Sequence, residues 1–215
     1  MKPKLKIIFA ISTIIVFLLI IMYRYNYFPH KKYANQYFDI EQYKSTLDKD
    51  NDGLDDQTDI LNNAQAYIVT KPKYKSKYYN NGYPDDGYGV CTDVIAYSLK
   101  NAGYDLRELV NEDIINNRDY YNIKVIDKNI DFRRVENLKI YFERHTIALT
   151  TDITDIEAWQ GGDIVIFRKH IGIVSDKRNR VGIAFIIHHA NPYQIFYEED
   201  ILSTRDDIVG HYRIS

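Results

Sequence analysis

The fold is decided by a stretch near the end of the chain, Gly162-Asp163-Ile164-Val165-Ile166-Phe167-Arg168-Lys169-His170-Ile171-Gly172-Ile173-Val174. Two runs rich in β-branched residues flank a short basic turn, which is the pattern of neighbouring antiparallel strands. Further runs of this kind follow at 183–188 and 208–214. The sequence therefore predicts a small antiparallel sheet in the C-terminal part of the chain.

Helical patterns occupy the part of the chain that precedes these strands. Apolar residues recur at helical spacing in four segments, 60–69, 91–102, 105–117 and 138–145. A chain in which helical segments come first and strands follow is predicted to have an α+β fold. The length of 215 residues suits one domain with an appendage. The formal net charge of −2 gives no electrostatic case for binding nucleic acid.

The first 24 residues differ in composition from the rest of the chain. Lys2, Lys4 and Lys6 precede an apolar run from Ile7 to Met22. This run is intermediate in length between a signal-peptide core and a full membrane span, and no small-residue cleavage pattern follows it. Residues 1–24 are therefore expected to be a single-pass anchor in the cell membrane, with the rest of the chain exported. A cleaved signal, which would give a secreted form, is the alternative.

An aspartate-rich loop lies in the predicted tether, residues 25–59, which joins the anchor to a domain expected at residues 60–215. The loop fits the twelve-residue calcium-binding pattern, with Gly53 at the position of the sharp turn. The expected oxygen ligands are Asp48, Asp50, Asp52, the Leu54 carbonyl, Asp56 and Asp59. A calcium ion here would be structural. A solvated turn that caps the next helix without metal is the alternative.

Cys91 is the one cysteine of the chain and follows the glycine-punctuated loop Asp85-Asp86-Gly87-Tyr88-Gly89-Val90. It stands where a predicted helix begins, and unpaired backbone N–H groups at such a position favour a thiolate. An exported thiol that cannot form an internal disulfide is a liability unless it has a function. A buried structural cysteine is the alternative reading.

Histidines downstream of Cys91 complete the requirements of a cysteine nucleophile, which needs an imidazole base and a polar group to orient it. His170 opens a predicted strand and is the expected base. The third member is expected from the next strand, where His188, His189 and Asn191 are candidates. The residues expected near the oxyanion or the substrate are Tyr88, Thr92 and Asp93, together with the Cys91 backbone N–H. A zinc site on Cys91, His170 and His188 is a rival reading.

At these residues the chain resembles the NlpC-type branch of the papain-like cysteine peptidases. More closely, it resembles a family of bacterial envelope proteins of unknown function within that superfamily. The matching stretches are Tyr88–Val94, Asn129–Leu138, Gly162–Val165, His170–Asp176, Ile186–His188, Glu199–Leu202 and Gly210–Arg213.

The resemblance implies a papain-like fold in which a cysteine-bearing helix packs on a small antiparallel sheet. It implies Cys91 and His170 as the catalytic pair and His188 as the third polar residue, while His189 stands where such sequences carry asparagine. Superfamily members cleave amide bonds in peptidoglycan stem peptides or between sugar and peptide. The segment with Arg133 and its neighbours Asp131 and Arg134 would either bind an acidic group or brace the site.

The expected function is that of a membrane-anchored cysteine hydrolase that cleaves an amide bond in cell-wall peptide through an acyl-enzyme. No cofactor is expected for catalysis. Two alternatives remain open at this point. One is a non-catalytic domain that binds the wall or a partner, and the other is a transferase that uses the same thioester chemistry. The sequence carries no signal for an oligomeric state.

Overall fold

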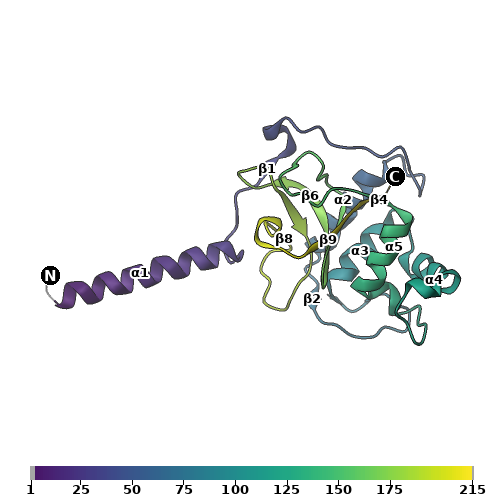
Figure 1. Ribbon diagram of the computed structural model, residues 1–215, viewed down its shortest axis with the longest axis horizontal. Helices are drawn as coiled ribbons and strands as arrows, with labels where there is room; N and C mark the ends of the chain where they lie inside the picture. Colours follow the sequence, from purple (N-terminus) through teal and green to yellow (C-terminus); the bar gives the residue numbers. More distant parts are fainter. Residues whose placement is uncertain (1–2, 215) are drawn as a thin grey trace.

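The computed structural model describes residues 3–214 and shows one long helix standing apart from a domain of mixed α and β structure (Figure 1). Helix α1 (Pro3–Arg24) has 22 residues and spans about 33 Å at the usual helical rise. Its apolar side chains are exposed, and its mean hydropathy reaches 2.8, so it is long and apolar enough to cross a membrane. A signal sequence has the same properties, and the finding is compatible with the expected anchor.

Within the described residues, seven antiparallel strands form one sheet in the spatial order β4-β9-β5-β6-β7-β8, with β1 pairing on β6. The strands are β1 (Tyr33–Ala34), β4 (Ile147–Ala148), β5 (Ile164–Phe167), β6 (His170–Arg178), β7 (Ala184–Ile187), β8 (Glu198–Glu199) and β9 (Ile208–Arg213). The Arg168-Lys169 turn joins β5 to β6, with Phe167 opposite His170. The prediction of an antiparallel C-terminal sheet is confirmed.

Four helices form the other layer: α2 (Asp56–Val69), α3 (Cys91–Asn101), α4 (Leu106–Asn116) and α5 (Val135–His145). They follow the predicted segments closely (Figure 1). Helix α2 begins four residues before the first predicted apolar position, because Asp55 caps it by accepting a hydrogen bond from the Thr58 N–H. Helix α3 packs on β6, which brings its N-terminus to the sheet.

The sheet has a hydrophobic cluster on each face. On the helical face, Ile171 and Ile173 of β6 pack with Ile95 and Leu99 of α3. On the other face, Phe167 and Val174 pack with Trp159, Leu202 and other residues of the connecting loops. Because both faces of β5 and of the first part of β6 are buried, Ile164–Phe167 and Ile171–Val174 contain no alternating polar residues.

The segment expected to be a tether packs on the domain. Ala34 of β1 pairs with Lys177 of β6, and the Asn35 side-chain oxygen accepts a 2.6 Å hydrogen bond from the buried Arg178. A parallel pair formed by β2 (Lys73–Tyr74) and β3 (Tyr88–Gly89) leads the chain to α3. Strands of two residues have too short a pattern to be recognised in sequence, which is why they were not predicted.

Candidate active site

Cys91 occupies the first position of α3. Val90 precedes it with extended backbone angles (φ −140°, ψ −178°), so the chain turns into the helix at the cysteine. The backbone N–H groups of Ile171, Thr92 and Cys91 itself lie near the sulfur and act to lower its pKa. The contact with Ile171 places the thiol against the start of β6, the strand that begins with His170.

A buried ion pair holds the start of α3. Arg133 of the short 3₁₀ helix η3 (Asp131–Arg133) donates to both carboxylate oxygens of Asp93, at 2.6 and 2.9 Å. Asp93 also accepts a 2.8 Å hydrogen bond from the Val90 N–H. Its fully buried carboxylate therefore holds the loop that carries Cys91, and it does not face a substrate as the sequence suggested. Of the two roles expected for the arginine segment, Arg133 performs bracing.

His170 begins a chain of three side chains, in which His170 is hydrogen-bonded to His188 and His188 is paired with Glu199. Its Nε2 lies 3.0 Å from Nδ1 of His188, and Nε2 of His188 lies 3.0 Å from Oε2 of Glu199. All three residues are buried. Of the three candidates for the third member, the structure places His188 against His170. Glu199 adds a further partner that sequence reasoning missed.

Cys91 and His170 belong to different faces of the sheet. Ile171 points into the cluster under the helices, where Cys91 also packs. The His170 ring stacks on Phe167 of the other cluster, with centroids 5.9 Å apart. Since neighbouring residues of a strand point to opposite faces, a proton could pass between the thiol and the imidazole only around the end of β6.

Burial sets the protonation states of both groups. It raises the pKa of the Cys91 thiol to about 11, although the three backbone N–H groups act in the opposite direction. Burial, with the charges of His188 and Arg205, holds the pKa of His170 well below its ordinary range. At neutral pH the pair is therefore a thiol and a neutral imidazole. The expectation that the helix N-terminus favours a resting thiolate is wrong, because desolvation outweighs the backbone hydrogen bonds.

The other candidates lie around this centre without joining it. His189 packs edge-on against Tyr74 and beside Tyr197, with ring centroids 5.3 and 5.0 Å away. Asn191 is exposed and accepts a hydrogen bond from the Tyr193 N–H in a turn.

Two further candidates near Cys91 have other surroundings than expected. Thr92 is buried, and its hydroxyl has no hydrogen-bond partner among residues 3–214. The ring of Tyr88 lies under the ammonium groups of Lys75 and Lys77, at 5.2 and 5.7 Å.

Tyr74 and Glu199 are the site residues that the sequence did not reveal. Burial and the nearby Cys91 raise the pKa of the Tyr74 hydroxyl, which places this phenol beside the thiol. Burial raises the pKa of Glu199 to about 7. Glu199 stands in the acidic run Glu198-Glu199-Asp200, where an exposed charge cluster is the ordinary reading. Only the pairing of β7 with β8 brings it to His188.

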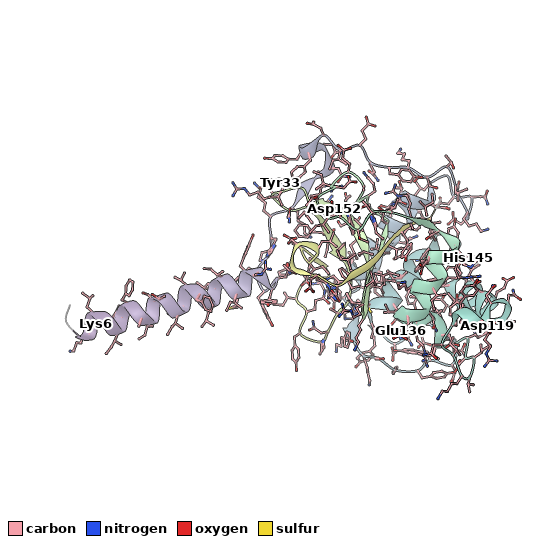
Figure 2. The ribbon with its side chains drawn as sticks, in the orientation of Figure 1. Lys6, Tyr33, Asp119, Glu136, His145 and Asp152 are labelled. Atoms are coloured by element: carbon pink, nitrogen blue, oxygen red, sulfur yellow. The ribbon has the colours of Figure 1, made fainter. Side chains whose placement is uncertain are left out.

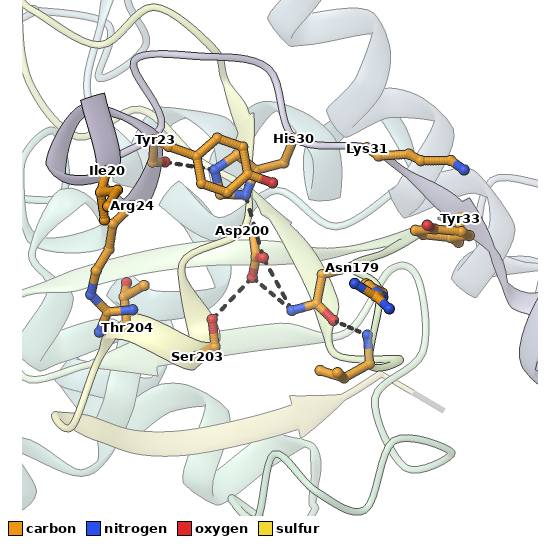
Figure 3. A pocket seen from close by; sticks show the side chains of 12 residues that line it. Ile20, Tyr23, Arg24, His30, Lys31, Tyr33, Asn179, Asp200, Ser203 and Thr204 are labelled. Atoms are coloured by element: carbon orange, nitrogen blue, oxygen red, sulfur yellow. Dashed lines mark hydrogen bonds and ion pairs between the residues drawn. The ribbon is translucent and has the colours of Figure 1, made fainter. Parts of the chain in front are cut away.

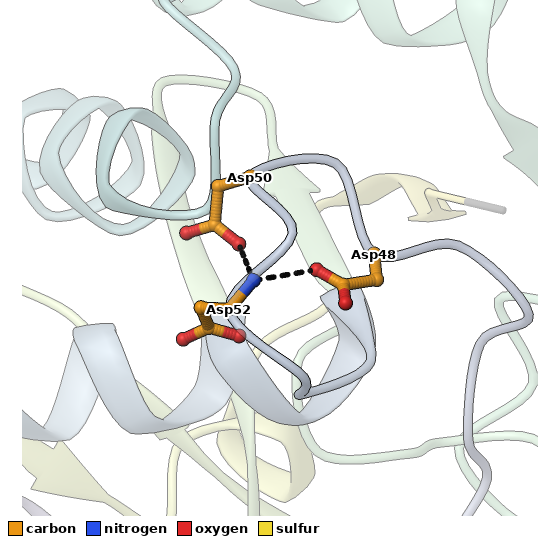
Figure 4. Close-up of side chains that lie close together, drawn as sticks. All are labelled: Asp48, Asp50 and Asp52. Carbon is orange, nitrogen blue, oxygen red and sulfur yellow. Dashed lines mark hydrogen bonds between the residues drawn. The ribbon is translucent and has the colours of Figure 1, made fainter.

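The aspartate-rich loop lies outside this site. Carboxylate oxygens of Asp48, Asp50 and Asp52, which Figure 4 shows close together, lie within 4.8 Å of one another. Gly53 has the positive φ of 93° that the sharp turn requires. Burial and the charges of Asp50 and Asp52 raise the pKa of Asp59 to about 6. Three carboxylates beside a fourth are a donor set that suits calcium.

One predicted calcium ligand points elsewhere. Asp56 accepts a 2.8 Å hydrogen bond from the Lys49 N–H and another from the Tyr104 hydroxyl. Among the described residues, the Asp48, Asp50 and Asp52 group is the one place where three potential metal ligands come together. The zinc reading of Cys91, His170 and His188 therefore finds no support in their arrangement.

Comparison with known proteins places the chain in a family. Residues 61–214 match the family described as "Domain of unknown function (DUF1287)". The chain belongs to the DUF1287 family. It is also 38% identical over 151 residues to the protein named "Uncharacterized protein YijF" of Escherichia coli (strain K12), across 66% of this chain and 72% of that protein. No solved structure matches the chain.

The DUF1287 match covers the whole candidate site and leaves out α1 and the loop at 48–59. Cys91, the histidine chain and Glu199 all lie within it, as does the Asp93–Arg133 pair. The matched residues thus include the domain that carries the thiol, and α1 and the aspartate-rich loop lie on their N-terminal side.

Proposed function

We propose that the protein is a cysteine hydrolase with a papain-like arrangement that cleaves an amide bond, with cell-wall stem peptides as the substrate class. The main support for the proposal is the position of the Cys91 thiol at the start of α3, against the backbone of β6 next to His170. Nε2 of His170 is hydrogen-bonded to His188. That hydrogen bond occupies Nε2 of His170 and leaves Nδ1 for the thiol proton. The resemblance to the NlpC branch supplies the substrate class.

The neutral resting pair determines how the reaction begins. Sγ of Cys91 attacks the carbonyl carbon while its proton moves to Nδ1 of His170, so charge separates only during attack. The Cys91 backbone N–H supports the oxyanion. The C–N bond then breaks, and His170 returns the proton to the leaving amine. Water attacks the thioester with His170 as base, which releases the acid and restores the thiol.

Glu199 decides which tautomer the histidines adopt. When it is ionised, it accepts the Nε2 proton of His188, so Nδ1 of His188 accepts from Nε2 of His170 and Nδ1 of His170 is free to act as the base. When Glu199 is protonated, it can donate to His188, which reverses both hydrogen bonds and places a proton on Nδ1 of His170. We therefore assign Glu199 as a positioning residue, 3.0 Å from His188 and buried.

A pH profile tests the role of Glu199. Because burial raises its pKa to about 7, above the ordinary range of a glutamate, we expect activity to fall as the pH drops through about 7. Glu199→Gln should lower the rate by about 10- to 100-fold, the loss typical of removing a group that orients a metal-binding histidine, and should remove this step. Glu198→Gln is the matched control, since Glu198 pairs with Lys32 and Ser175 instead. An unchanged step in Glu199→Gln would contradict the assignment.

Product analysis tests the proposed function itself. The full chain in detergent is incubated with purified peptidoglycan, and the released fragments are sequenced. Hydrolysis gives a new free carboxylate and a new amine. A transferase gives the amine together with a new amide, and a binding domain gives no fragment. Fragments that are the same with the Cys91→Ala chain would refute the proposal.

We further propose that α1 anchors the protein in the cell membrane with the domain on the extracytoplasmic side, where cell-wall peptide is present. The supporting observations are the length of α1 and the exposure of its apolar side chains. Protease protection in intact cells tests the orientation. Degradation of the domain from outside is the expected result, and protection would reverse the topology.

We also propose that the loop at 48–59 holds a structural calcium ion through Asp48, Asp50, Asp52 and Asp59. The gathered carboxylates support this, since a cation would relieve the repulsion that contributes to the raised pKa of Asp59. Calcium at 100 times its Kd should stabilise the fold by about 2.7 kcal/mol. Thermal melting measures the effect, and Asp50→Asn should abolish it. Asp176→Asn, far from the loop in sequence, is the control, and an equal shift in both variants would exclude the site.

A further inference from the structure

Cavities surround the end of α1 where it joins the domain. One of about 370 Å³ is lined by Tyr23 and Arg24 of α1 together with Lys31, Arg180 and Ser203 of the domain (Figure 3). A second, of about 330 Å³, lies between Tyr25, Tyr27 and the loop that carries Tyr193 and Ile195. We call the surface formed by residues 23–33, 179–181 and 191–195 the junction face.

Specific contacts fix the direction in which α1 leaves the domain. The His30 ring stacks on Tyr23 of α1 at 4.1 Å, and its Nε2 lies 2.7 Å from the Tyr23 carbonyl. Its Nδ1 lies 3.5 Å from Asp200, whose backbone carbonyl accepts a hydrogen bond from Asn26. A bilayer that contains α1 would therefore meet the junction face, whichever side of the membrane the domain occupies.

The junction face exposes side chains suited to the boundary between lipid and water. Tyr193 is 80% exposed, Tyr25 67% and Ile195 53%. All three line the second cavity, so they form one patch from separate parts of the chain. Tyrosine is enriched at membrane interfaces because its ring is apolar and its hydroxyl is polar.

The same face carries positive charges that no acidic side chain neutralises. Among the ion pairs within residues 3–214, none includes Arg24, Lys31 or Arg180. All three are exposed and line the first cavity. Asp200, the acidic residue in that cavity, is engaged by His30, Asn179 and Ser203. Uncompensated cations at the membrane surface attract anionic headgroups.

We propose that the junction face lies on the bilayer that holds α1 and binds the phosphates of anionic phospholipids through Arg24, Lys31 and Arg180, with Tyr193 and Ile195 at the level of the headgroups. The proposal is independent of the chemistry of Cys91. It also predicts which side of the domain faces the membrane, because Glu199 lines the same cavity as Tyr193 and Ile195. The end of the histidine chain is thus on the membrane side of the domain.

Spin-label accessibility in the full chain tests the proposal. The Cys91→Ser chain, which has no other cysteine, receives a label through Tyr193→Cys, or through Tyr120→Cys as the matched control. Tyr120 is a 63% exposed tyrosine that follows Asp119 in the chain, and Asp119 lies at the end of the domain remote from α1 (Figure 2). Vesicles contain phosphatidylcholine alone or with phosphatidylglycerol. We expect a several-fold higher ratio of oxygen to nickel-chelate collisions at 193 than at 120, and a larger ratio when phosphatidylglycerol is present.

Removal of the cations separates docking from simple proximity. Lys31 and Arg180 are both exposed, and the double variant Lys31→Gln/Arg180→Gln removes their charges. In this variant, phosphatidylglycerol should no longer raise the collision ratio at position 193, and the ratio at position 120 should be unaffected. A ratio at 193 equal to that at 120 would overturn the docking. A ratio that is the same in both vesicle types, or a gain that persists in the double variant, would overturn the assignment to anionic headgroups. Because the labelled chains lack Cys91, neither result depends on whether the protein is a hydrolase.

Discussion

Replacing His170 by alanine is expected to lower amide hydrolysis by about 10³-fold or more, close to the loss in Cys91→Ala, because thiol and imidazole act as one unit. Alkylation of Cys91 by iodoacetamide at neutral pH provides a measurement that needs no substrate. With a thiol pKa of about 11, little thiolate exists at neutral pH, and reaction depends on proton transfer to His170. We expect His170→Ala to slow alkylation by about 10²-fold.

The adjacent histidines supply the control for this experiment. His188→Gln removes the 3.0 Å partner of His170 and should lower both hydrolysis and alkylation. His189→Gln alters a ring that packs between tyrosines and should have the smaller effect on both rates. The reverse order would assign the third position to His189. Alkylation that is equally fast in His170→Ala and the unaltered chain would refute the thiol–imidazole pair.

Loss of Arg133 is expected to destabilise the fold by about 3–5 kcal/mol, the usual cost of leaving one member of a buried ion pair without its partner. In Arg133→Met, the fully buried Asp93 keeps only its hydrogen bond from the Val90 N–H. Burial already raises the pKa of Asp93 even with the guanidinium present, which shows how costly its charge is. Denaturant unfolding of the full chain measures the loss.

Two further variants distinguish the ion pair from a general effect of removing charge. Arg134→Met changes the next residue, whose side chain is 60% exposed and lies 3.6 Å from Asp131, and should cost about 0–1 kcal/mol. Arg133→Met combined with Asp93→Leu removes both charges and should recover most of the stability. Equal losses in Arg133→Met and Arg134→Met would show that Asp93 does not depend on its partner.

The main elements of the fold could be predicted because their patterns are local. The runs around Val165 and Ile173 gave β5 and β6, and helical spacing gave α3 with Cys91 at its first turn. The two-residue strands could not be predicted, because β1 exists only through its pairing with Lys177 and Arg178 of β6. For the same reason, the packing of the predicted tether on the sheet had no signal in the sequence.

The residues of the candidate site also differ in whether the sequence alone could reveal them. Cys91, His170 and His188 could be proposed from the sequence because nucleophilic catalysis restricts the residue types that can perform it. Glu199 was not found, since its proximity to His188 depends on the pairing of β7 with β8. The protonation state of Cys91 was predicted in the wrong direction. A helix N-terminus can be recognised from sequence, but the desolvation that raises this pKa is a property of the packed site.

The sequence by itself determined the antiparallel strands, the helix that begins at Cys91 and the apolar N-terminal segment, because each arises from interactions among residues close together in the chain. Only the tertiary structure decided that the thiol lies against β6, that Glu199 continues the histidine chain, and that Tyr25 and Tyr193 share one surface beside α1. These arrangements join distant segments. Their energies come from burial and pairing, which exist only once the chain has folded.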